Sequence, residues 1–140
     1  MLFHIKLSIF YQSVVIHDHA KDDIRDIAKL NKNAAATVLV LLQQLKVDPN
    51  TTISKLTTYG DNDIEAHHVN VKPWEKVKGI GNLWRFRILD SPATSHRVIY
   101  GYHYQTRQLC ILAVVNKDNY DYDDLTSEIN QRIISDWKSI

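Results

Sequence analysis

Leu83-Trp84-Arg85-Phe86-Arg87-Ile88 and Arg97-Val98-Ile99-Tyr100 predict two adjacent β-strands joined by a short loop. Successive side chains of a strand point to opposite faces of the sheet. Arg85 and Arg87 therefore share one face, and the apolar residues between them share the other, which we expect to be a core. Three arginines on two neighbouring strands predict a surface that binds phosphate.

Two further strands belong to the same sheet. The apolar run over residues 109–115 follows a polar turn, so residues 83–89, 97–104 and 109–115 predict an antiparallel meander. A β-branched run near the N-terminus predicts an earlier strand over residues 14–18.

Apolar residues at helical spacing predict three helices. Two of them, over residues 21–30 and 34–47, are separated by Asn31-Lys32-Asn33, and the second ends before Pro49. They form an αα-hairpin whose apolar stripe is expected to pack against the sheet. The third helix is expected near the C-terminus, within residues 126–137.

The chain has 140 residues, 44% of them hydrophobic, which suits one core and is too short for two full domains. We expect a single α+β domain over residues 1–140, with residues 1–13 as a possible extension and residues 50–73 as a possible inserted hairpin or loop. No apolar run approaches the roughly 20 residues that span a bilayer, and no secretory signal is expected. Cys110, the single cysteine, lies in an apolar run, so we expect a buried thiol and a cytoplasmic location.

The formal net charge of +1 hides an uneven distribution, because residues 72–117 contain eight Lys and Arg against two Asp and Glu. This local excess of positive charge is what an approaching polyanion senses.

Two motifs carry a resemblance to a known family. "LWRFRILDSPATSHRVIYGY" (83–102) is similar to a basic strand followed by an "YRVIY" strand, and "ILAVVNKDNYDYDD" (111–124) is similar to a terminal strand followed by a basic residue and a tyrosine. With the order of elements, residues 14–137 resemble the RelE/ParE toxin superfamily of bacterial toxin-antitoxin modules. The resemblance implies an N-terminal strand and αα-hairpin packed on an antiparallel β-meander, with a short C-terminal helix.

The resemblance implies a ribosome-dependent messenger RNA endoribonuclease, independent of metal, that inhibits translation and is neutralised by a cognate antitoxin. Its basic residues and tyrosine correspond by position to Arg85, Arg87, Arg97, Lys117, and Tyr120 or Tyr122. Basic residues flanking the strands, Lys76, Lys78 and His96, are expected RNA contacts. We expect no cofactor and no membrane partner.

The reaction that the resemblance implies, attack of an RNA 2′-hydroxyl on the adjacent phosphate, needs a base, cations on the phosphorane and an acid at the 5′-oxygen. Arginine supplies cations, but its high pKa makes it a poor base. Proton transfer would therefore fall to Lys117, Tyr120, Tyr122 or a histidine.

Alternatives remain for both the function and the residues. A related toxin could bind DNA gyrase without enzymatic activity, or the domain could be an inactive antitoxin-binding module. Arg85 and Arg87 could instead form surface ion pairs with Asp118, Asp121, Asp123 or Asp124. Trp74 could stack on a base, although packing is the more common role.

The seven histidines do not predict a metal site. His67 and His68 are adjacent and would face opposite sides of a strand, which argues against a paired site. His17 and His19 share a face, but their place at the end of the first strand favours a structural role. His103 shares a face with Arg97 but lies about 20 Å along the strand.

Overall fold

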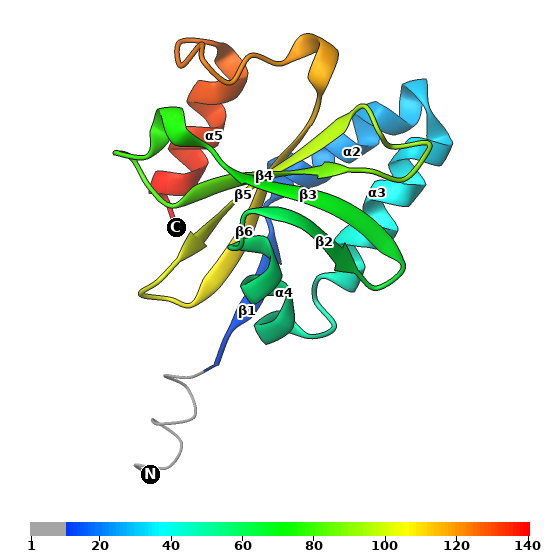
Figure 1. Cartoon of the computed structure of the whole chain (residues 1–140). Helices are drawn as coiled ribbons and strands as arrows, with labels where there is room; N and C mark the ends of the chain where they lie inside the picture. Colours follow the sequence, from blue (N-terminus) through cyan, green and yellow to red (C-terminus); the bar gives the residue numbers. More distant parts are fainter. Residues whose placement is uncertain (1–10) are drawn as a thin grey trace.

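The computed structural model describes residues 11–140, in which a mixed six-stranded sheet has the order β1-β6-β5-β4-β3-β2 (Figure 1). The expected antiparallel meander is confirmed as β4 (Leu83–Ile88), β5 (His96–His103) and β6 (Gln108–Asn116). The N-terminal strand, β1 (Ser13–Ile16), pairs with β6 in parallel. The α+β class is therefore confirmed. Most of the possible N-terminal extension lies outside the described residues.

The segment between the helical hairpin and the meander contains a helix as well as the expected hairpin. The helix, α4 (Pro49–Leu56), starts with proline, and Asp48 caps it by accepting a hydrogen bond from the Thr51 N–H (3.3 Å). β2 (Gly60–Ile64) and β3 (His67–Pro73) then pair in antiparallel, and β3 pairs with β4. The inserted segment thus widens the sheet beside the arginine-bearing strand.

Helices α2 (Asp18–Leu30) and α3 (Lys32–Gln44) form the expected αα-hairpin. Asn31 serves both: its N–H donates to the Ile27 carbonyl (2.8 Å) and its side chain accepts from the Ala34 N–H (3.0 Å). These helices and α4 pack on one face of the sheet and form the larger core. Phe86 and Tyr100 are fully buried in it, as the alternation predicts, while Trp84 packs at its border.

The last helix, α5 (Glu128–Lys138), contributes to a second, smaller core on the other face. Gly101 permits its approach, since a Cβ there would lie 2.5 Å from the Trp137 ring. Cys110 is buried in this core, and burial raises the pKa of its thiol to about 11. The expected packing role of Cys110 is therefore confirmed, and its thiol stays protonated at neutral pH.

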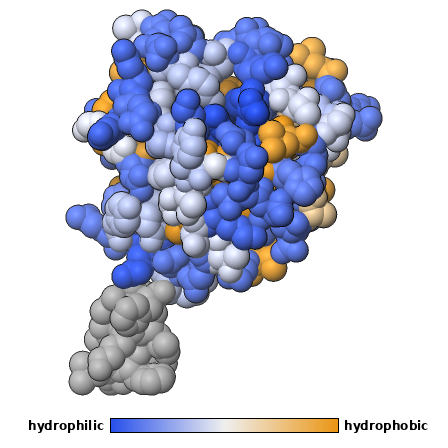
Figure 2. All heavy atoms as spheres, in the orientation of Figure 1, coloured by the Kyte–Doolittle hydropathy of each residue, from blue (hydrophilic) through white to orange (hydrophobic). Residues whose placement is uncertain are grey.

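The described surface carries no sign of a membrane span. Within residues 11–140 no helix combines the length and the apolar composition that crossing a bilayer requires. The face seen in Figure 2 is mostly hydrophilic, with hydrophobic residues in small separate patches.

Tyr100→Phe should destabilise the fold by about 1–3 kcal/mol. The Tyr100 hydroxyl donates to the Leu56 carbonyl at the end of α4 (2.6 Å), so phenylalanine leaves a buried acceptor unpaired. Urea unfolding of both proteins measures the difference. Tyr102→Phe is the matched control, because no hydrogen bond joins its hydroxyl to the described residues, and its change should stay within about 0.5 kcal/mol. Equal stabilities for all three proteins would contradict this role of Tyr100.

Candidate active site

The strand register brings the three arginines together. Arg87 lies directly opposite Arg97 on β5, and Lys72 on β3 lies directly opposite Arg85. Paired residues of neighbouring strands project from the same face. The expectation that Arg85, Arg87 and Arg97 share one face is therefore confirmed, and the larger core occupies the other.

These arginines line a pocket of about 320 Å³. Its other walls come from the end of β3, the 3-10 turn Glu75–Val77 and the segment before α5. The lining residues besides the arginines are Lys72, Pro73, Trp74, Glu75, Lys76, Tyr122 and Asp123. Five cationic side chains thus converge on one hollow, with two carboxylates among them.

Two of the arginines are held by neutral groups. Arg85 donates to the Asn70 carbonyl (2.7 Å) and the Asn70 side-chain oxygen (3.0 Å). Arg97 donates to the Thr94 carbonyl (3.1 Å) and the His96 carbonyl (3.2 Å). Burial, more than the neighbouring cations, lowers the pKa of both guanidinium groups, which still stay protonated at neutral pH.

No carboxylate of the described residues forms an ion pair with the three arginines. Across residues 11–140, no Asp or Glu oxygen lies within 4.0 Å of a guanidinium nitrogen of Arg85, Arg87 or Arg97. The alternative that the aspartates at 118–124 pair with them is therefore wrong. Arg97 is only 8% exposed and forms no ion pair in the described part of the chain, although the more distant Asp118 partly opposes the lowering of its pKa.

The structure distinguishes the two candidate tyrosines. Tyr122 lines the arginine pocket, and its hydroxyl is buried without a hydrogen-bond partner among the described residues. Burial raises the pKa of Tyr122, while Arg85 and Arg97 act against that rise. Tyr120 instead donates to the side chain of Asn130 on α5 and does not line the pocket. The geometry therefore favours Tyr122 as the tyrosine of the site.

Trp74 holds Tyr122 in place. Its indole N–H donates to the Tyr122 carbonyl (3.0 Å). Its ring also packs edge-to-face against the rings of Tyr122 and Tyr120, with centroid separations of 5.9 and 6.4 Å. Such edge-to-face pairs stabilise beyond the area they bury. Trp74 is 4% exposed, so its expected packing role is confirmed.

Comparison with known proteins gives no match. No family model, curated protein or solved structure is significantly similar to this chain. The chemistry of the pocket therefore follows from its own groups. Arginines bind phosphate oxygens through paired donors, and a neutral tyrosine hydroxyl can donate a proton. Glu75 and Asp123 provide carboxylates at the pocket wall, of which one could accept a proton.

The other basic residues predicted for the site differ in whether they line the arginine pocket. Lys76 lines the pocket, whereas Lys78 lies on a neighbouring hollow. Lys117 is exposed in the 3-10 turn Lys117–Asn119 and is not part of the pocket lining.

The structure does not bring His96 to the arginines. Strand alternation turns it away from Arg97, and it lines a separate pocket that also includes Asn31 and Asn116. It is buried, its Nδ1 has no partner among the described residues, and burial lowers its pKa. His96 therefore does not belong to the arginine pocket, and its contact with RNA stays a prediction.

The sequence analysis did not predict three residues of the pocket lining, Lys72, Pro73 and Glu75, and it named Asp123 only as an ion-pair partner. Lys72 shares a face with Arg85 only because β3 pairs with β4 in this register. The available signal was the alternation of apolar Val69 and Val71 with polar Asn70 and Lys72. It indicates which residues share a face only once this segment is recognised as a strand of the hairpin.

Proposed function

We propose that this chain is a messenger RNA endoribonuclease that acts on ribosomes in the cytoplasm, without a catalytic metal, as the toxin of a toxin-antitoxin pair. One observation carries most of the proposal: Arg97 is nearly buried, forms no ion pair with the described residues and donates its hydrogen bonds to neutral carbonyl groups, beside Arg85 and Arg87 in an open pocket. A buried cation without a counterion is costly. A phosphate group of RNA would supply that counterion.

The proposed reaction is attack of an RNA 2′-oxygen on the adjacent phosphorus. The new bond from the 2′-oxygen to phosphorus forms as the bond from phosphorus to the 5′-oxygen breaks, which leaves a 2′,3′-cyclic phosphate and a 5′-hydroxyl. The 2′-proton passes to Glu75 or Asp123, and the Tyr122 hydroxyl donates its proton to the 5′-oxygen. The arginines stabilise the charge that develops on the phosphorane.

A cognate antitoxin follows from the same proposal. Its carboxylates or an added strand would cover the arginine pocket and compete with RNA for the cations. β2 is available for strand addition, because it pairs only with β3 and forms an edge of the sheet.

Induced expression in a bacterial host, followed by mapping of messenger RNA 5′ ends with and without active translation, tests the proposal. We expect growth arrest and cuts at fixed positions within codons, present only during translation. Growth arrest with intact messages and DNA damage signalling would overturn the nuclease and favour a gyrase-binding toxin. Absence of arrest at every expression level would leave an antitoxin-binding module.

A further inference from the structure

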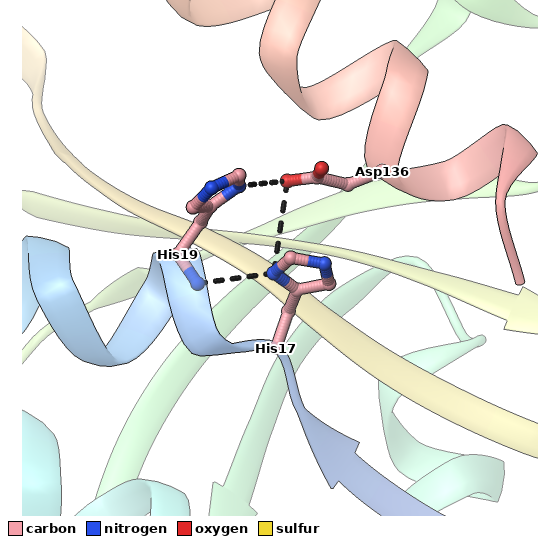
Figure 3. A group of neighbouring side chains, drawn as sticks. All are labelled: His17, His19 and Asp136. Atoms are coloured by element: carbon pink, nitrogen blue, oxygen red, sulfur yellow. Dashed lines mark hydrogen bonds and ion pairs between the residues drawn. The ribbon is translucent and has the colours of Figure 1, made fainter.

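His17, His19 and Asp136 form a cluster away from the arginine pocket (Figure 3). The two histidines come from the junction of β1 and α2, and Asp136 comes from α5. One ring nitrogen of each histidine and one carboxylate oxygen lie within 4.8 Å of one another. His19 Nδ1 lies 2.6 Å and His17 Nδ1 lies 3.7 Å from Asp136 Oδ2.

The backbone fixes both histidines. The N–H of His17 donates to the Ile111 carbonyl (2.9 Å), which holds it beside β6. Its ring caps α2, because Nδ1 accepts a hydrogen bond from the His19 N–H (3.0 Å). The two side chains therefore project together over the start of the helix, as Figure 3 shows.

The carboxylate of Asp136 is not engaged in a close ion pair with Lys or Arg of the described residues. Its side chain is only 11% exposed, and the nearest other cation is Arg132, whose Nε lies 3.9 Å from Oδ2. The charge of Arg132 is already compensated, since its two terminal nitrogens donate to the carboxylate of Asp23 (2.9 and 2.8 Å). The negative charge of Asp136 is therefore directed mainly at the two histidines.

We propose that His17, His19 and Asp136 bind a divalent transition-metal ion of the Zn²⁺ type and thereby tie the β1–α2 junction to α5. Two imidazole nitrogens and one carboxylate oxygen suit Zn²⁺, whereas Mg²⁺ and Ca²⁺ prefer oxygen ligands. Tetrahedral Zn²⁺ with bonds near 2.1 Å places its ligand atoms about 3.4 Å apart. The two distances from the histidine Nδ1 atoms to Asp136 Oδ2, 2.6 and 3.7 Å, bracket that separation. Ligation requires His17 Nδ1 to release the hydrogen bond from the His19 N–H, and His19 Nδ1 to release its hydrogen bond with Asp136.

The site is also accessible. The side chain of His19 is 46% exposed and that of His17 30% exposed, so an ion can enter from solvent and keep a water as fourth ligand. The pair His17 and His19 was visible in the sequence, but its third ligand lies 117 residues beyond His19. Only the packing of α5 brings Asp136 to the histidines.

Titration calorimetry of the metal-free full chain with Zn²⁺ tests the proposal, with Mg²⁺ as the negative probe. We expect binding of one Zn²⁺ per chain, a higher unfolding temperature with Zn²⁺, and a visible absorption band when Co²⁺ replaces it. His19→Ala and Asp136→Asn should each weaken Zn²⁺ binding by at least about 100-fold, because loss of a residue that only hydrogen-bonds to a metal ligand already costs about 10–100-fold.

Two further variants separate ligation from folding. His17→Asn removes the imidazole but keeps a good helix cap, so it should lose Zn²⁺ while retaining its metal-free stability. His68→Ala is the matched control, because His68 is exposed and paired with Asp63 elsewhere on the surface, and it should bind as the parent does. Absence of Zn²⁺ binding, or binding that survives all three ligand substitutions, would overturn the proposal. Neither outcome bears on the ribonuclease, since none of the three ligands lines the arginine pocket.

Discussion

Arg97→Ala should reduce ribosome-dependent RNA cleavage by about 10²–10³-fold, the loss typical when one preorganised donor to a developing oxyanion is removed. Its guanidinium lies at the pocket wall, held by the Thr94 and His96 carbonyls. Single-turnover cleavage of a messenger RNA on purified translating ribosomes measures the rate. Arg97→Lys should recover only part of it, because an ammonium keeps the charge but loses the planar fork that binds two phosphate oxygens.

The same substitution should leave the fold intact. Alanine at this position removes a nearly buried cation that forms no ion pair with the described residues, so the thermal unfolding temperature of Arg97→Ala should match or exceed that of the parent. Arg25→Ala is the control, because Arg25 is an exposed helical arginine paired with Asp22. Full activity of Arg97→Ala would remove Arg97 from the mechanism. Lost activity together with lost folding would show that Arg97 has a structural role instead.

Tyr122→Phe should lower the cleavage rate by about 10²–10⁴-fold, the usual contribution of a general acid. The hydroxyl has no partner among residues 11–140, so its removal should barely change stability. Because burial raises the pKa of Tyr122 above its ordinary 10.0, the acid remains protonated through neutral pH. Activity of the parent should therefore show no alkaline loss from this group below about pH 10.

Tyr120→Phe should have the opposite effects on stability and cleavage rate. Its hydroxyl bonds the Asn130 side chain, so this variant should lose about 1 kcal/mol of stability and keep its cleavage rate. Rate measurements and urea unfolding on both phenylalanine variants give a two-by-two comparison. A fall in rate for Tyr120→Phe with none for Tyr122→Phe would reverse the assignment of the acid.

Local pattern was enough to predict the arginine face. The alternation in Arg85-Phe86-Arg87 determines which side chains share a face as soon as the segment is a strand, whatever surrounds it. The helical hairpin was equally local, since Asn31 caps both of its helices. The helix α4 was not predicted, because Thr51, Thr52 and Ile53 are β-branched and have lower helical propensity.

Long-range packing determined the rest. Tyr120 and Tyr122 stand two residues apart, and only their contacts with Asn130 and Trp74 tell them apart. His96 adjoins Arg97 in sequence, yet strand alternation sends the two side chains into different pockets. Spacing along the chain carries no information on such contacts between distant segments.

The parallel pairing of β1 with β6 has a consequence for synthesis of the chain. β1 is synthesised before its partner strand, because Gln108 follows Ser13 by about 95 residues. At roughly 5–20 residues per second, β1 waits on the order of 5–20 s for β6. α2 and α3 can pair during that interval, whereas Tyr122 emerges later still. The arginine pocket therefore cannot form before the second half of the sheet and the segment that contains Tyr122 have been synthesised, so the pocket is assembled later than the helical hairpin.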